Sequence, residues 1–210
     1  MNTTTTFARL LVGTAITTFA LAGCTSGTGS TAPGPASDST PSVVTQDEFN
    51  DADVAFALGM IPHHRQAIEM AELVAGRTET PEVLDLAARI GGAQEPEINT
   101  MTTWLEEWDA EVPAEDDAMG GMAGMDHGGT GGMEGMGGMM TPEQMTALEQ
   151  VSGAEFDRMF LEMMAEHHRG AIEMAQTELD DGSAPEALTL AQTIIDAQQA
   201  ELTEMETLLQ

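Results

Sequence analysis

The sequence predicts an all-α protein, a four-helix bundle built from two helical hairpins. The first observation is an internal repeat, because residues 53–101 align with residues 157–205 at an offset of 104 without a gap. The second is an apolar pattern of helical spacing in each half, and the third is the absence of strand signals from either half. Two hairpins supply four amphipathic helices, and a bundle is the simplest arrangement that buries all four apolar faces.

Residues 1–23 have the features of a secretory signal peptide. Arg9 is the only charge before the apolar segment 10–22, which is too short to span a bilayer. The only cysteine of the chain, Cys24, follows Leu-Ala-Gly, which resembles the bacterial lipoprotein signal, in which the cysteine becomes the lipidated first residue. We therefore expect an extracytoplasmic protein that a lipid anchors to the bacterial cell membrane, on its periplasmic or cell-surface side. An ordinary signal peptide, cut nearby, is the alternative.

The chain then divides into four parts, which follow from composition and from the repeat. They are a lipidated cysteine with a flexible Ser/Thr/Gly/Pro-rich tether (24–45), a first hairpin (46–110), a Gly/Met-rich loop (111–141) and a second hairpin (142–210). Thr141-Pro142 is expected to open the third helix, which the repeat makes the counterpart of the first.

Glycine and proline signals divide each hairpin into two helices. Gly76 and Gly182 are predicted to end the first helix of each hairpin. Thr80-Pro81 and the segment 183–186 are predicted to start the second helices, and Ser183 and Glu186 have the spacing of a capping box. Two further prolines lie inside predicted helices, where we expect kinks or local unwinding. These are Pro62 and Pro96.

Composition excludes several classes of function. The net charge is −30, with no lysine and six arginines, so the surface repels nucleic acid and attracts cations. A mature chain whose only cysteine is lipidated has neither disulfides nor thiolate metal sites. The chain has seventeen methionines, but only six phenylalanines and no tyrosine. The expected partners are therefore metal ions, together with the membrane through the anchor, and composition identifies no protein partner.

The double-histidine motifs lie on the buried face of the first helix of each repeat. At 100° per residue, one face carries Asp, Met, two His and a second Met, with Arg65 and Glu69 on the opposite face. The candidate ligands on these faces are Asp53, Met60, His63, His64 and Met70, and Asp157, Met164, His167, His168 and Met174. The second helices place Glu97 and Met101, and Glu201 and Met205, on one face beside Gln94 and Gln198.

Imidazole and thioether ligands together favour copper. Thioether sulfur is soft and prefers Cu(I), imidazole binds both copper oxidation states, and carboxylate completes a Cu(II) or Zn(II) site. Copper is thus the expected ion, with another transition metal as an alternative. The histidines could instead form a buried hydrogen-bond network with Asp and Glu, with methionine as packing. A di-iron centre is disfavoured, since the Glu-x-x-His motif is missing.

The Gly/Met-rich loop offers a second set of soft ligands. Its glycine content opposes a stable helix, so its methionines have no core to fill. Thioethers spaced by three residues on such a chain can enclose Cu(I) or Ag(I), and a histidine adds a nitrogen. The alternative is a low-complexity linker. The candidate ligands are Met119, Met122, Met125, His127, Met133, Met136 and Met139.

The paired motifs 60–71 and 164–175 resemble the family known as domain of unknown function 305, which comprises secreted bacterial proteins with one or two double-histidine repeats. The resemblance covers 47–109 and 142–210 and implies a ferritin-like four-helix bundle. Some relatives are linked to periplasmic copper binding and resistance, which implies a ligand role for the four histidines and the adjacent methionines. The chain departs from the family by its Met/Gly insertion and by Pro96.

The sequence therefore favours an extracytoplasmic lipoprotein that sequesters or delivers copper, and a binding protein over an enzyme. A metal-dependent oxidoreductase using the same histidines would need an open coordination position and a substrate cleft. A metal-free interaction module would use the histidines as a buried network or a pH sensor. Because a ligating imidazole must be neutral and its unperturbed pKa is about 6.5, histidine-bound metal is expected to weaken as pH falls from 6 towards 5.

Overall fold

The computed structural model describes residues 49–114 and 137–210, and these residues form five α-helices and no strand. The helices are α1 (Asp51–Leu73), α2 (Pro81–Glu107), α4 (Pro142–Gln150), α5 (Ala154–Asp181) and α6 (Pro185–Leu208). None of the described helices is both long enough and apolar enough to cross a membrane. The predicted signal peptide, Cys24, the tether and most of the Gly/Met-rich loop lie outside the described residues.

The starts of the long helices follow from their local sequence. The Asn50 side chain accepts hydrogen bonds from the amides of Ala52 and Asp53 and caps α1. Proline stands at the first position of both α2 and α6, where its missing N–H leaves no hydrogen bond unmade. After α1 the chain turns at Gly76, whose φ of 80° favours glycine.

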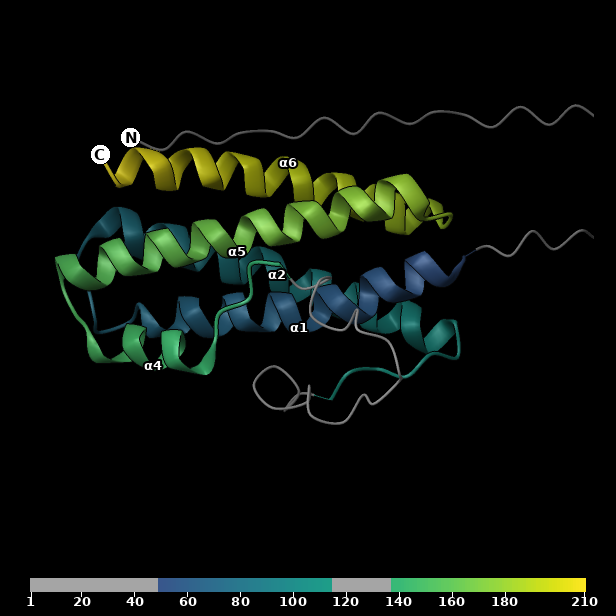
Figure 1. Cartoon of the computed structure of the whole chain (residues 1–210), viewed down its shortest axis with the longest axis horizontal. Helices are drawn as coiled ribbons and strands as arrows, with labels where there is room; N and C mark the ends of the chain where they lie inside the picture. The colour runs from purple at the N-terminus through teal and green to yellow at the C-terminus, as the bar shows by residue number, and fades with distance from the viewer. Residues whose placement is uncertain (1–48, 115–136) are drawn as a thin grey trace, which may run out of the picture. The chain divides into compact units, whose positions relative to one another are not determined.

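The four long helices form the bundle as two antiparallel hairpins (Figure 1). α1 packs along α2, α5 packs along α6, and the hairpins meet mainly through α1 and α5. One apolar cluster combines the first half of α1 with the second half of α5, and the other combines the remaining halves. α1 and α5 are therefore antiparallel, and the two repeats are related by an approximate two-fold axis. The predicted all-α bundle of two hairpins is confirmed.

The predicted third helix is divided in two. Thr141 caps the short helix α4 with the expected capping box through Gln144. The chain then becomes extended at Val151 and turns at Gly153, whose φ is 62°. The Gly153 amide donates to the carbonyl of Arg77 (2.6 Å), which fixes this turn on the first hairpin. The break follows from Ser152-Gly153, because glycine is unfavourable inside a helix. The repeat does not require a continuous helix at this point.

Two local expectations are corrected. α6 is capped at Ala184 without a side-chain hydrogen bond, and the Ser183 hydroxyl donates instead to Asp53 (3.1 Å), so the predicted capping box does not form. Both helices remain helical through Pro62 and Pro96, so the local unwinding expected there does not occur, and the expected kinks stay a prediction.

Candidate metal centre

The double-histidine motifs lie halfway along the bundle, between the two apolar clusters. His63, His64, His167 and His168 have no exposed surface. On both α1 and α5, the core residues before the histidines and those after them belong to different clusters. The four imidazoles therefore form a polar layer across an otherwise apolar core, which we call the histidine layer.

The two repeats meet at His63 and His167. Their ring centroids lie 3.8 Å apart, with the ring planes inclined by 45°. These residues are equivalent in the repeat and come from antiparallel helices, so their contact marks the approximate two-fold axis. Both double-histidine motifs therefore come together in one core.

Carboxylates from the second helix of each hairpin orient two of the histidines. His64 Nε2 lies 2.7 Å from Glu97 Oε2, and His168 Nε2 lies 2.7 Å from Glu201 Oε2. An ionised carboxylate can only accept, so a neutral ring must donate through Nε2–H and keep its lone pair on Nδ1. Such carboxylate–imidazole pairs are the usual way to orient a metal-ligating histidine. Glu97 and Glu201 were expected among the metal ligands, but in this structure each is the hydrogen-bond partner of a histidine.

The two histidines at the axis differ from each other. His63 Nε2 donates to the carbonyl oxygen of Gly137 (3.2 Å), which again leaves Nδ1 as the acceptor. His167 is 0% exposed, and neither of its ring nitrogens makes a well-formed hydrogen bond, although the His63 backbone lies close to the ring. Nδ1 of the other three histidines is also unpartnered. Since about nine in ten buried polar groups are hydrogen-bonded, this concentration of unpaired nitrogens in one layer requires an explanation.

Burial keeps the axial pair neutral. It lowers the pKa of His63 to about 3, with the neighbouring His64 adding to the effect. Burial, followed by the proximity of His63 and His168, also lowers the pKa of His167 well below 6.5. A neutral imidazole is the form that ligates a metal. The expected loss of metal between pH 6 and 5 assumed an unperturbed pKa, and burial moves proton competition at these two rings to lower pH.

Two glutamines add further unpaired groups beside the layer. Gln94 and Gln198 are 2% and 3% exposed, and they occupy equivalent positions in α2 and α6. Both amide atoms of the Gln94 side chain and Oε1 of Gln198 lack partners. The sequence placed both residues on the buried face but gave them no role. The available sequence signal was that both repeats have glutamine at the same position of an otherwise apolar helix face.

Thioethers lie on both sides of the histidine layer. Met60 and Met101 belong to one apolar cluster, Met164 and Met205 belong to the other, and all four are 0% exposed. Since Met60 is equivalent to Met164 and Met101 to Met205, each side of the layer has one methionine from a first helix and one from a second helix. Sulfur ligands are thus available next to the nitrogen ligands on both faces.

The remaining candidates on the first helices lie further from the layer. Met70 and Met174 stand seven residues beyond His63 and His167, about 10 Å along a helix, within or against the apolar clusters. Asp53 stands about 15 Å before His63 and accepts hydrogen bonds from the amides of Ser183 (3.0 Å) and Ala184 (2.9 Å).

Asp157, the counterpart of Asp53, also forms a hydrogen bond to the other hairpin, through one carboxylate oxygen. Its Oδ2 accepts from Thr80 Oγ1 (2.6 Å), at the start of α2. Both aspartates therefore join the start of a first helix to the start of the other hairpin's second helix. They hold the two ends of the bundle, and the ligand set that we propose below leaves them out.

A buried carboxyl pair occurs at only one of these ends. Glu178 is 1% exposed and lies against Asp53. Burial, and then the proximity of Asp53, raise the pKa of Glu178 to about 8. Burial would raise the pKa of Asp53, but the neighbouring Glu178 and hydrogen bonds from the backbone lower it overall. The equivalent of Glu178 in the first repeat is Val74, so the repeat gave no signal for this pair.

Most candidates in the Gly/Met-rich loop lie outside the described residues. These are Met119, Met122, Met125, His127, Met133 and Met136. Met139 is described and is half-buried, next to the buried Met140.

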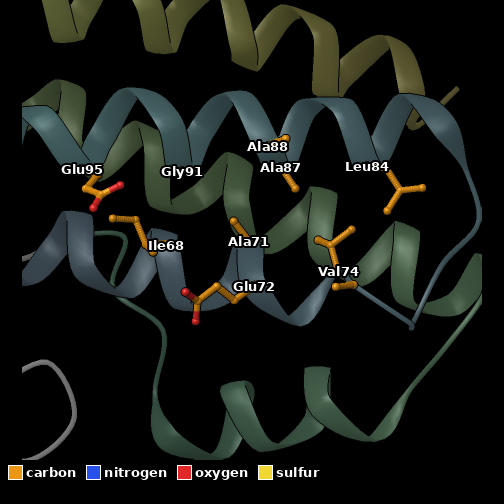
Figure 2. A pocket seen from close by; sticks show the side chains of 10 residues that line it. Ile68, Ala71, Glu72, Val74, Leu84, Ala87, Ala88, Gly91 and Glu95 are labelled. Atoms are coloured by element: carbon orange, nitrogen blue, oxygen red, sulfur yellow. The ribbon is translucent and has the colours of Figure 1, made fainter.

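The described residues contain no group of three His, Cys, Asp or Glu side chains that converge closely enough to hold a metal. Any ion in the layer would therefore need sulfur ligands or a rearrangement of side chains. A groove of about 350 Å³ lies elsewhere, between α1 and α2 (Figure 2). It is lined by apolar residues such as Ala71, Leu84 and Ala87, and by no residue of the histidine layer.

The fold and this layer define a bundle of two helical hairpins with histidines buried at its pseudo-symmetry axis. Residues 53–209 match the family model of the domain of unknown function DUF305. The chain belongs to that family.

Solved structures agree with this assignment. A putative secreted DUF305 protein from Streptomyces coelicolor is 32% identical, with a TM-score of 0.64 over 75% of this chain and 91% of that one. A DUF305 fragment from Deinococcus radiodurans is 27% identical, with a TM-score of 0.61 over 76% and 96%. CopM in its Cu(II)-bound form is 35% identical, with a TM-score of 0.60 over 75% and 95%.

CopM has also been solved with Cu(I) and with silver, and these forms are 33% identical to this chain, each with a TM-score of 0.56. Among curated proteins, an uncharacterized protein of Acanthamoeba polyphaga mimivirus is 42% identical over 55 residues. That match spans 26% of this chain and 36% of the viral protein.

Proposed function

We propose that this protein is an extracytoplasmic, lipid-anchored copper carrier whose histidine layer binds a soft ion, Cu(I) or Ag(I), for sequestration or delivery. The observation that carries the proposal is the state of His167: it is fully buried, neither ring nitrogen makes a well-formed hydrogen bond, and its ring lies 3.8 Å from that of His63. A hydrogen-bond network that served only the fold would pair these nitrogens.

The available ligands favour a soft monovalent ion. Four imidazoles lie between two pairs of buried thioethers. The nearby carboxylates of Glu97 and Glu201 are already hydrogen-bonded to histidines. Zn(II) prefers four nitrogen, oxygen or thiolate ligands, whereas Cu(I) accepts thioether and imidazole with fewer ligands. The likeness to CopM, which has been solved with Cu(I), Cu(II) and silver, supports copper as the cargo.

Burial favours a carrier over an oxidoreductase. All four histidines are 0% exposed, so no substrate larger than an ion reaches them in this conformation. The surface is strongly acidic, with a net charge of −30 for the chain, which raises the local concentration of cations. We place Cys24 as the lipid attachment point, so that the bundle works outside the cytoplasmic membrane.

The test compares two double variants. His63→Ala with His64→Ala is expected to weaken Cu(I) binding about as much as His167→Ala with His168→Ala, by about tenfold or more, because the repeats contribute equally. Replacing all four should remove nitrogen ligands from the X-ray absorption spectrum of the Cu(I)-loaded protein. His127→Ala is tested separately, because His127, the only other histidine, is a candidate ligand of the loop and could supply a nitrogen of its own. Unchanged nitrogen coordination in the quadruple variant would contradict the proposed site.

A further inference from the structure

A short segment at the end of the Gly/Met-rich loop lies directly on the histidine layer. This segment, Gly137–Met140, is called the strap here. The Gly137 carbonyl accepts the hydrogen bond of His63 Nε2 (3.2 Å), and Met140 is 7% exposed and packs in an apolar cluster. The strap is therefore in contact with one histidine of the layer and anchored in the core at its other end.

Gln66 fastens the strap to α1. Its Nε2 donates to the Met140 carbonyl (2.9 Å), and the Met140 amide donates to its Oε1 (2.6 Å). Gln66 is 1% exposed and stands about one helical turn after His63. A two-way hydrogen bond in a buried setting is costly to break, because both partners would be left unpaired. Gln66 thus fixes the strap relative to the helix that carries His63.

Gly170 provides the room for the strap on α5. A Cβ at Gly170 would overlap the carbonyl group of Gly137, and one at Gly138 would lie 2.7 Å from the Glu166 carbonyl oxygen. Gly138 also has a φ of 86°, which favours glycine. Gly170 is the repeat equivalent of Gln66, so the same repeat position fastens the strap on one helix and admits it on the other.

The segment before the loop is held at the same place. Arg65 Nη1 donates to the carbonyls of Pro113 (3.0 Å) and Ala114 (2.8 Å). Both described ends of the loop therefore attach to α1 immediately after His63-His64. The bundle itself sets the position of the strap through these attachments.

We propose that the strap, held by Gln66 and Gly170, positions His63 as a metal ligand by keeping its Nε2–H on the Gly137 carbonyl and its Nδ1 free to bind the ion. The inference rests on the proposed function and assigns Gln66, Gly137 and Gly170 as positioning residues. In the metal-free protein it also distinguishes His63 from its counterpart His167, which makes no hydrogen bond to the strap. His63 is held in one tautomer before the metal arrives, whereas His167 is not.

The experiment uses two variants of the full chain that disturb the strap differently. Gly170→Ala places a methyl group where the Gly137 carbonyl lies, and Gln66→Met keeps the side-chain length but removes both hydrogen bonds. The control is Gly91→Ala, another helical glycine, whose added Cβ would meet nothing within 4 Å. Circular dichroism checks the fold of each variant.

Two readouts separate positioning from general stability. In the apo protein, ¹⁵N–¹H correlation spectra of labelled histidine should show a single Nε2–H tautomer for His63, which becomes mixed in both strap variants and stays single in Gly91→Ala. Competition with a chromophoric Cu(I) chelator should show about a tenfold or larger loss of affinity in the strap variants, which is the usual effect of removing a hydrogen bond that orients a ligand.

Folded strap variants that keep the single tautomer and the wild-type Cu(I) affinity would overturn the inference. If Gly170→Ala does not fold, Gln66→Met decides alone, since it adds no atom to a tight contact. A wild-type protein that binds no Cu(I) would overturn the proposed function and the ligand role of His63 with it. The tautomer spectra of the apo protein would then still show whether the strap holds His63.

Discussion

Replacing His167 with leucine is expected to make the metal-free protein more stable, because this histidine is the worst-satisfied side chain of the layer. Its neutral ring buries one N–H donor and one lone pair, and neither makes a well-formed hydrogen bond. Leaving a buried polar group unpaired costs about 1–3 kcal/mol. Leucine removes both unpaired groups, and its different shape costs about 1 kcal/mol in repacking. The net expectation, with both groups counted, is a gain of about 1–5 kcal/mol in the free energy of unfolding.

The other three histidines supply graded controls. His63→Leu should gain less, since it gives up the hydrogen bond to Gly137. His64→Leu and His168→Leu remove the partners of Glu97 and Glu201, whose side chains are 16% and 13% exposed, and should be neutral or destabilising.

The assay is urea unfolding of the full chain in the presence of a strong chelator, followed by far-ultraviolet circular dichroism. With excess Ag(I), wild type should instead be more stable than His167→Leu, because an ion that binds only the folded wild-type protein stabilises it by mass action. If metal-free His167→Leu is less stable than wild type by more than about 1 kcal/mol, its imidazole supports the fold. The central argument for a metal site would then be refuted.

Three further predictions follow from the other groups. The folded pKa of Glu178, about 8, lies above its ordinary value of 4.5, so the folded protein keeps a proton that the unfolded chain releases, and stability should decline as pH rises from about 4.5 to 8. Glu178→Gln should abolish most of this decline, about 2 kcal/mol between pH 6 and pH 9 after allowing for screening by water at the end of the bundle; urea unfolding at both pH values measures it, and equal slopes in both proteins would contradict it. Because the pKa of His63 is about 3, Cu(I) bound in the histidine layer should persist at pH 5 in a variant that keeps the strap but has Met119, Met122, Met125, His127, Met133 and Met136 replaced by alanine, and release between pH 6 and 5 in equilibrium dialysis would show that the imidazoles titrate as exposed ones. Cys24→Ser should move the protein from the membrane fraction to the soluble fraction, and identical partition in detergent extraction would remove the lipid anchor from the proposal.

Much of the fold follows from the repeat. The gap-free alignment of 53–101 with 157–205 predicted two equivalent hairpins, and helical periodicity placed His63, His64 and their counterparts on the buried face. The repeat could not predict α4 as a separate helix, because the turn at Gly153 depends on a hydrogen bond to Arg77 of the other hairpin. Periodicity shows which side of a helix is buried, but it contains no information about which atoms meet there.

The sequence by itself determined that this protein is helical, that its halves are equivalent, and that imidazole and thioether groups share its core. Only the tertiary structure decided what each of those groups does. Glu97 became the partner of His64, Asp53 became a link between hairpins, and Gln66 and Gly170 came to hold a strap on His63. The physical reason is that tautomers and pKa values depend on burial and on partners distant in the chain. Gly137, which fixes the tautomer of His63, lies 74 residues away from it.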